Sequence, residues 1–173
     1  MRSRYGADVI WLPFDLHPEY PPEGLPRQQL IARYGPGMTD HVRGMFEGVG
    51  LEYNPHPEIV PNTRTALRLT EYARDQGLHQ PVHDRLMDAY WSEGQDIGAP
   101  ETLRRLAAEA GLTDVDGVFE GDAYLDRVLG STAEAQSIGI TGIPAFLLDT
   151  RLLVLGAQPR EVFERAFEQL EEG

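Results

Sequence analysis

The segment GIPAFLLDTRLLVLG, residues 142–156, constrains the fold more than any other part of the chain. It contains two short apolar runs, PAFLLD and RLLVLG, which meet across a polar turn around Thr150–Arg151. Apolar runs of strand length joined by so short a turn predict an antiparallel β-hairpin. The residues that follow, QPREVFERAFEQLEEG, predict a helix with Pro159 at its start and an apolar inward face. The C-terminal part of the chain is therefore expected to be strand, strand, helix.

Upstream of the hairpin the pattern is mostly helical. One strand is predicted at ADVIWLPFDL, residues 7–16, where β-branched and aromatic residues cluster and Pro13 indicates an edge or a bulge. The segments HPEYPPEGLP and YNPHPEIVPN are rich in proline and are predicted to be loops. The predicted order along the chain is therefore strand, helices, two strands and a final helix. Helices with glycine or proline near their ends are predicted at 26–35, 38–49, 63–76, 80–94, 99–111 and 121–139.

Charge and composition exclude several classes of function. The formal net charge is −13, and so acidic a surface repels phosphate backbones, which predicts no nucleic-acid partner. No apolar run has the length of a membrane span, and the N-terminus MRSRYGADVIW lacks the apolar region of a signal peptide. These features predict a cytoplasmic protein with no membrane partner. The chain contains no cysteine, so these 173 residues supply no thiol nucleophile, thiolate metal ligand or disulfide.

Four segments, taken in their order along the chain, are similar to one known family. They are WLPFDLHPEYPPEG, VPNTRTALRLTEYA, HDRLMDAYWSEGQDIGAPETLRRLAAEAGL and SIGITGIPAFLLDTRLLVLGAQP. They resemble the FrnE-like branch of the DsbA family in the thioredoxin superfamily, which is related to 2-hydroxychromene-2-carboxylate isomerases and kappa glutathione transferases. The resemblance implies an α/β, thioredoxin-like fold with an inserted all-helical domain. Residues 1–59 and 139–173 would form the thioredoxin-like domain, and residues 60–138 the insertion.

The resemblance also implies a substrate-binding site at the loop that enters the hairpin. In the family this loop contains a cis-proline, so we expect the Ile143–Pro144 bond to be cis. Because proline has no N–H, such a loop offers an edge at which an extended peptide can pair. The predicted substrate-binding residues are Thr141, Gly142, Ile143, Pro144 and Asn62. For Asn62, which resembles a family position near the active-site cleft, capping of the helix that begins near Thr63 is an alternative interpretation.

The chain departs from the family at its N-terminus. Family members open with a strand, a Cys-x-x-Cys motif and a helix, a unit of on the order of 30 residues, before the strand that matches residues 7–16. We therefore expect no catalytic residue in this chain, and two unpaired strand edges where the first strand would lie. Three explanations are open: an N-terminally shortened sequence in which RSRYGADV ends the missing helix, a short protein that completes its sheet by dimerisation, or a binding relative without redox activity.

Three functions are consistent with this resemblance. The first is a thiol–disulfide oxidoreductase without a cofactor, acting on a thiol- or disulfide-containing protein or a small thiol, with its cysteines supplied by the missing segment. The second is a glutathione-dependent isomerase or transferase, in whose relatives the missing helix carries serine. The third is a non-catalytic peptide- or thiol-binding module. For the chain as it stands we expect no redox activity, and we expect a homodimer because unpaired strand edges need covering.

His79 and His83 have the four-residue spacing of a helical zinc-binding pair. Pro81 lies between them, however, and proline suits the first position of a helix. We therefore expect His79 to precede the helix, and we predict no metal site in the chain.

Overall fold

The computed structural model describes residues 2–35 and 37–172, and the chain forms two compact units. Unit 1 consists of the described residues of Met1–Leu16 and Gly130–Gly173, and unit 2 is His17–Leu129. Unit 1 is thus built from both ends of the chain. The predicted division into residues 1–59 with 139–173 and residues 60–138 rests on the family resemblance rather than on contacts, and it stays a prediction.

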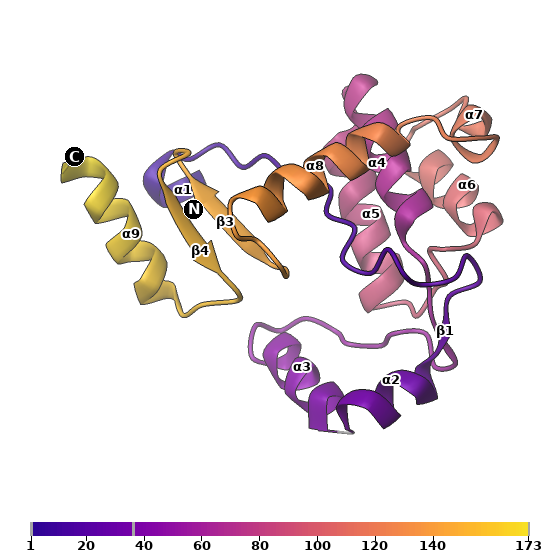
Figure 1. Ribbon diagram of the computed structural model, residues 1–173, viewed down its shortest axis with the longest axis horizontal. Coiled ribbons are helices and arrows are strands. Elements are labelled where there is room, and N and C mark those ends of the chain that lie inside the picture. The colour runs from indigo at the N-terminus through magenta and orange to yellow at the C-terminus, as the bar shows by residue number, and fades with distance from the viewer. Residues whose placement is uncertain (1, 36, 173) are drawn as a thin grey trace. The chain divides into compact units, whose positions relative to one another are not determined.

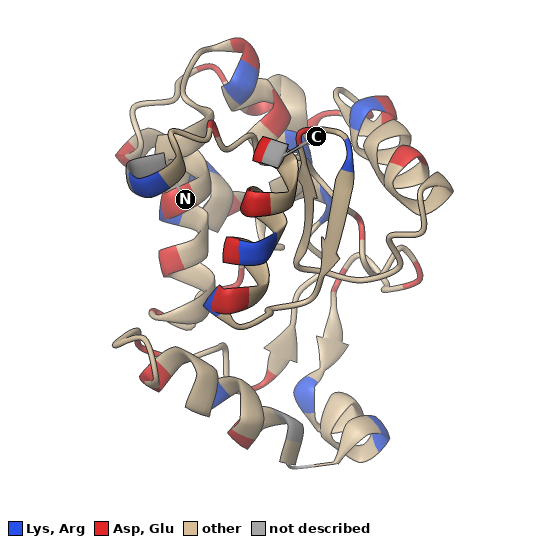
Figure 2. Cartoon of the chain, turned by 90° about the vertical axis from the view of Figure 1, so that its left-hand side faces the viewer, with Lys and Arg blue, Asp and Glu red and all other residues tan. Residues whose placement is uncertain are grey.

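Unit 2 is helical, and its core is formed by the apolar faces that the sequence pattern predicted. Leu69, Leu86 and Leu103 are at most 2% exposed, and Val82, Leu106 and Ala107 are buried with them. Its helices are α2 (Arg27–Tyr34), α3 (Gly37–Glu47), α4 (Arg64–Asp75), α5 (His79–Trp91), α6 (Pro100–Glu109), the short α7 (Asp116–Phe119) and the start of α8 (Leu125–Ser137). All but α7 were predicted to within a few residues. Figure 2 shows that acidic and basic residues are interspersed along the helices.

A buried arginine on α4 holds the segment between α7 and α8. The Arg68 side chain donates to the carbonyl oxygen of Ala123 at 2.7 Å and to those of Val118 and Gly121. Arg68 is only 8% exposed, and its burial lowers the pKa of the guanidinium, because desolvation disfavours the charged form. Three carbonyl acceptors compensate for that desolvation. They also fix the segment that joins α7 to α8.

The predicted loops at residues 17–26 and 53–62 contain a short ladder that sequence reasoning did not predict. Strand β1 (Leu25–Pro26) pairs antiparallel with β2 (Ile59–Val60). Gly24 precedes β1 at a φ of +78°, and a Cβ there would lie 2.6 Å from the carbonyl oxygen of Val60. Glycine is therefore needed for the two loops to approach so closely.

Unit 1 contains the predicted hairpin, its helix and a short N-terminal helix (Figure 1). These are α1 (Arg2–Tyr5), β3 (Ala145–Leu148), β4 (Leu152–Leu155) and α9 (Arg160–Glu172). The prediction of an antiparallel hairpin is confirmed, with Ala145 opposite Leu155 and Leu148 opposite Leu152. At the turn, Asp149 and Thr150 have φ values of +48° and +54°. No helix in the described ranges has both the length and the hydropathy needed to cross a membrane.

One face of the hairpin is packed and the other is exposed. Phe146 makes an edge-to-face contact with Phe163 of α9 at 4.9 Å between ring centroids, and Tyr5 of α1 stacks on Phe167 of α9 at 4.2 Å. Side chains of a strand alternate between its two faces. Leu147, Leu153 and Leu155 therefore project from the opposite face, where they are 48%, 36% and 47% exposed.

The prediction of a strand at residues 7–16 is wrong for this structure. Residues 6–15 form neither helix nor strand, and the strands of the described chain pair only with one another, β1 with β2 and β3 with β4. A strand is stable only when a neighbour satisfies its backbone groups. Near the end of the segment, Ser131 donates to the carbonyl of Pro13 at 2.8 Å, and the amide of Asp15 donates to Thr132 Oγ1 at 2.9 Å.

Replacing Arg68 by lysine should destabilise the chain. Lysine keeps the charge but cannot reach three carbonyl groups with a planar fork, so at least one buried acceptor loses its partner. We expect the free energy of unfolding in urea to fall by about 2–4 kcal/mol. The control is Arg105→Lys, at an exposed ion pair with Glu109, which should change it by about 0.5 kcal/mol or less. Equal effects of the two substitutions would contradict the role assigned to Arg68.

Candidate functional site

The end of α8 directs the chain into the predicted substrate loop. Gly139 follows the helix at a φ of +90°, and its amide donates to the carbonyl of Gln136 at 3.0 Å. The amide of Ile140 donates to the carbonyl of Ala135, also at 3.0 Å. These two bonds form a Schellman motif, which ends the helix and turns the chain away from its axis. Ile140 is 8% exposed, so it anchors the first end of the loop.

The hairpin anchors the second end of the loop. The Ile143–Pro144 bond is cis, as the resemblance implied. The carbonyl of Pro144 accepts a hydrogen bond from the amide of Gly156 at 2.8 Å, which extends the β3–β4 ladder by one pair. The loop is thus fixed between a helix end and a strand pair.

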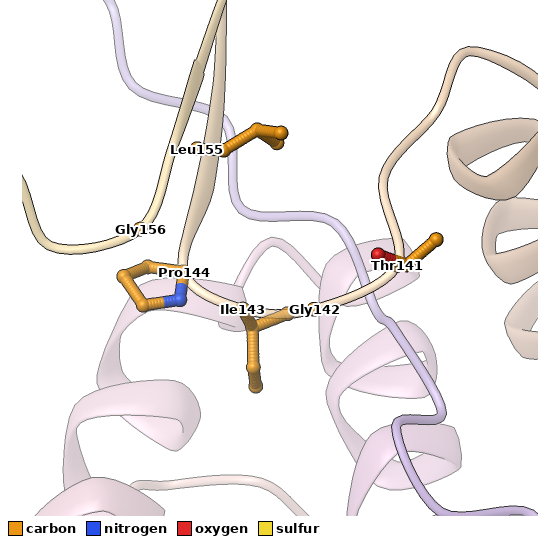
Figure 3. A pocket seen from close by; sticks show the side chains of 6 residues that line it. All are labelled: Thr141, Gly142, Ile143, Pro144, Leu155 and Gly156. Carbon is orange, nitrogen blue, oxygen red and sulfur yellow. The ribbon is translucent and has the colours of Figure 1, made fainter.

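Four of the five predicted site residues line one pocket (Figure 3). Its volume is about 220 Å³, and its walls are Thr141, Gly142, Ile143, Pro144, Leu155 and Gly156. Sequence reasoning missed Leu155 and Gly156, which the observed register places opposite Ala145 and Pro144. The predicted turn at Thr150–Arg151 would pair them one residue further along, because the observed turn also includes Asp149.

The chemistry of this pocket is that of binding. None of its six lining residues has an acidic or basic side chain, so the pocket contains no group for proton transfer. Ile143 and Leu155 are 56% and 47% exposed and present apolar surface. Within the described chain, no backbone hydrogen bond reaches Thr141, Gly142 or Ile143. The loop therefore offers backbone donors and acceptors beside apolar side chains.

The outer edge of β3 continues this row of backbone groups. In an antiparallel ladder, alternate residues point their N–H and C=O groups toward the partner strand. Pro144 bonds to Gly156, so the residues whose groups face away from β4 are Ala145 and Leu147. Both described sheets have only two strands, and the outer edge of β3 has no strand partner among the described residues.

Asn62 lies in unit 2, and its side chain has local partners. Its Nδ2 donates to the carbonyl of Tyr20 at 2.8 Å, and its Oδ1 accepts from the amide of Arg64 at 3.0 Å. It thus caps the start of α4, while the side chain of Thr63 makes no capping bond. Its participation in the substrate site stays a prediction.

Gly156→Ala should disturb the site by straining the backbone. Gly156 has a φ of +79°, a conformation that costs a residue with a side chain about 1–2 kcal/mol. We expect a loss of that size in the free energy of unfolding, measured in urea. The matched control is Gly142→Ala in the same loop, where a Cβ would meet no atom within 4 Å and φ is not in the left-handed region. A loss at Gly142 equal to that at Gly156 would contradict this account.

Known proteins resemble the chain over most of its length. A solved structure of the probable DsbA oxidoreductase SCO1869 from Streptomyces coelicolor is 30% identical, with a TM-score of 0.87 over 96% of this chain and 76% of that one. The YwbO protein of Bacillus subtilis is 29% identical over 92% of this chain and 80% of its own length. A structure from Nitrosomonas europaea, at 17% identity and a TM-score of 0.64 over 99% of this chain and 86% of that one, shares the fold alone.

The family of the chain is shown by a match over almost the whole sequence. The match to the DSBA-like thioredoxin domain extends over residues 1–168, and it includes the hairpin, the loop that enters it and the helical unit 2. The arrangement of small sheets and many helices agrees with that fold. The chain belongs to the DSBA-like thioredoxin domain family.

Proposed function

We propose that this chain is the substrate-binding part of a thiol–disulfide oxidoreductase of the FrnE-like branch. The observation that carries the proposal is the loop at Thr141–Ile143, whose backbone groups have no backbone partner within the described chain, in a member of the DSBA-like family. The similarity to the probable DsbA oxidoreductase SCO1869 favours this chemistry over a glutathione-dependent isomerase.

The substrate is an extended polypeptide that contains a thiol or a disulfide. Its backbone pairs with the loop at Ile143 in the manner of an added strand, where main-chain hydrogen bonds provide affinity. Apolar side chains of the substrate contact Ile143 and Leu155, which are exposed beside the pocket. Because the pocket has no charged lining residue, recognition depends on hydrogen bonds to the substrate backbone and on the fit of its side chains. Substrates with many different sequences can therefore bind.

The chemical step requires cysteines that these 173 residues do not contain. In thiol–disulfide exchange a thiolate attacks one sulfur of a disulfide, a mixed disulfide forms, and the other sulfur leaves as a thiolate. Our proposal assigns that thiolate to a segment outside this sequence, placed next to the loop. The chain contributes the binding of the substrate beside the reacting sulfur atoms.

The 173-residue chain alone should show no redox turnover. In an insulin-reduction assay with dithiothreitol, and in an assay for oxidation of a dithiol peptide, we expect the rate of the buffer blank, because the chain has no thiolate. A disulfide isomerase serves as the positive control. Turnover above the blank would contradict the assignment of the chemistry to another segment.

The protein in its native source tests the same proposal directly. Intact mass spectrometry after alkylation with iodoacetamide should give a mass above the 19.3 kDa of this chain, together with alkylated cysteine. A native mass of 19.3 kDa without alkylation would show that the cysteines are not on the same polypeptide. A heavier protein with serine in place of the cysteine pair would overturn the redox assignment.

We also propose that the isolated chain dimerises through β3. Among the described residues, no strand pairs with the outward-facing backbone groups of Ala145 and Leu147, and the same strand exposes the apolar side chain of Leu147. An exposed apolar edge of this kind is a template for pairing with another strand. Pairing between two copies would satisfy these groups and cover Leu147.

Light scattering can test the dimer with one substitution. The parent chain should have about twice the 19.3 kDa of one copy, and Leu147→Lys should shift it toward one copy, because a charge on an edge strand opposes pairing. The control is Leu51→Lys, at a residue of unit 2 that is 58% exposed. A parent chain that is monomeric at all concentrations would contradict this proposal.

A further inference from the structure

Gln158 lies just beyond the pocket in the sequence and bonds twice to its wall. Its side-chain Nε2 donates to the carbonyl oxygen of Leu155 at 2.8 Å, and its backbone amide donates to the carbonyl oxygen of Gly156 at 3.0 Å. Leu155 and Gly156 are two of the six residues that line the pocket, whereas Gln158 is not among them. Gln158 is therefore connected to the site through two of its lining residues.

The backbone bond of Gln158 replaces one that a proline cannot make. In a hydrogen-bonded pair of antiparallel strands, each residue donates its N–H to the carbonyl of the other. Gly156 donates to the carbonyl of Pro144 at 2.8 Å, but Pro144 has no N–H to donate in return. The carbonyl of Gly156 instead accepts from the amide of Gln158, two residues later, in a three-residue turn. This turn closes the end of the β3–β4 ladder.

The side-chain bond of Gln158 acts on the same peptide unit that holds the substrate loop. The peptide between Leu155 and Gly156 is planar and trans, so its C=O and its N–H point in opposite directions. Its N–H donates to the carbonyl of Pro144, and its C=O accepts from Gln158 Nε2. A rotation of this unit would break both bonds together. The Gln158 side chain therefore keeps the Gly156 N–H directed at Pro144, where the loop enters the hairpin (Figure 3).

The neighbours of Gln158 in the sequence hold it in this position. Gly156 has a φ of +79°, and Gln158 Nε2 would lie 3.5 Å from a Cβ at Gly156, so the side-chain amide lies beside that backbone. Pro159 restricts the backbone of the residue before it to extended conformations. Helix α9 then begins, and its Phe163 packs on Phe146 of β3. Little conformational freedom is therefore left for Gln158 to lose when it bonds to the wall.

We propose that Gln158 is a positioning residue for substrate binding. It holds the pocket wall at Leu155 and Gly156 in a fixed place relative to the loop that contains Ile143. The spacing of the Ile143 and Leu155 side chains, which the substrate contacts, depends on that wall. The inference rests on the proposed function, in which the loop binds the backbone of a polypeptide. What the position requires is an N–H donor that reaches the carbonyl of Leu155.

Three substitutions of Gln158 separate the donor from the shape of the side chain. Gln158→Met keeps the length without a donor, Gln158→Glu replaces the N–H donors by acceptor oxygens, and Gln158→Lys keeps N–H donors. The probe is a fluorescein-labelled peptide, Ala-Val-Cys-Val-Ala with its sulfur methylated, and its binding to the chain is measured by fluorescence anisotropy. We expect the Met and Glu variants to bind about threefold more weakly and the Lys variant to bind like the parent. The same three substitutions at Gln169, which is exposed on α9, are the control and should leave the affinity unchanged.

Hydrogen exchange measured by NMR tests the positioning without the peptide. In Gln158→Met the amide of Gly156 should exchange about threefold faster than in the parent chain, because the peptide unit has lost one of its two bonds. The amide of Arg151 donates to the carbonyl of Leu148 at the turn of the same hairpin, at 3.0 Å, and should keep its rate. This contrast separates a local effect at the pocket wall from a general loss of stability.

Two results would overturn the inference. One is a Gln158→Met chain in which the amide of Gly156 exchanges at the parent rate. The other is a Gln158→Lys chain that loses as much affinity as Gln158→Met, because the donor would then not be what the site requires. A parent chain that does not bind the peptide, together with faster exchange at Gly156 in Gln158→Met, would contradict the proposed function and would support the effect of Gln158 on the wall.

Discussion

The pairing of β3 with β4 is the interaction on which the candidate site depends. Its register sets Pro144 opposite Gly156, and the amide of Gly156 then holds one end of the loop. The Schellman motif at Gly139 holds the other end, with Ile140 buried beyond it. Between these anchors the backbone groups of Thr141–Ile143 have no backbone hydrogen bond within the described chain, so they can pair with a ligand. Backbone groups alternate in direction along a strand, so the N–H and C=O groups of Ala145 and Leu147 point away from β4.

Much of the fold could be predicted because proline and glycine mark the ends of its elements. Pro100 begins α6, and Gly77, Gly111 and Gly139 follow the ends of α4, α6 and α8. These three glycines have left-handed φ values, which favour glycine over other residues. The hairpin was predictable from two apolar runs. Its observed register brings Leu155 and Gly156 to the pocket, and the sequence pattern did not predict that register. The residues of the loop itself came from resemblance to a family, since no local pattern distinguishes GIP from an ordinary turn.

The wrong predictions have physical causes that cannot be read from the pattern of residues along the sequence. Residues 7–16 have the composition of a strand, but a strand also needs a partner, and composition does not supply one. Pro81 was predicted to begin its helix after His79, but the helix begins at His79 and Pro81 is its third residue, because the first turn of a helix tolerates proline at more than one position. Arg68 lies in an amphipathic helix where arginine usually faces solvent, and its burial depends on carbonyl groups some fifty residues away.

The discontinuity of unit 1 has a consequence for the order in which the chain folds. The contacts within unit 2 are made by helices that are close in sequence, and such local contacts form quickly. Unit 1 instead must join residues before His17 to residues after Leu129, which in an unfolded chain means closing a long loop. The bond between Asp15 and Thr132 lies where the chain leaves unit 1 and returns to it. Once unit 2 has formed, the two halves of unit 1 no longer have to find each other through a flexible chain. We therefore expect unit 2 to fold first and the hairpin with its loop to become ordered last during synthesis.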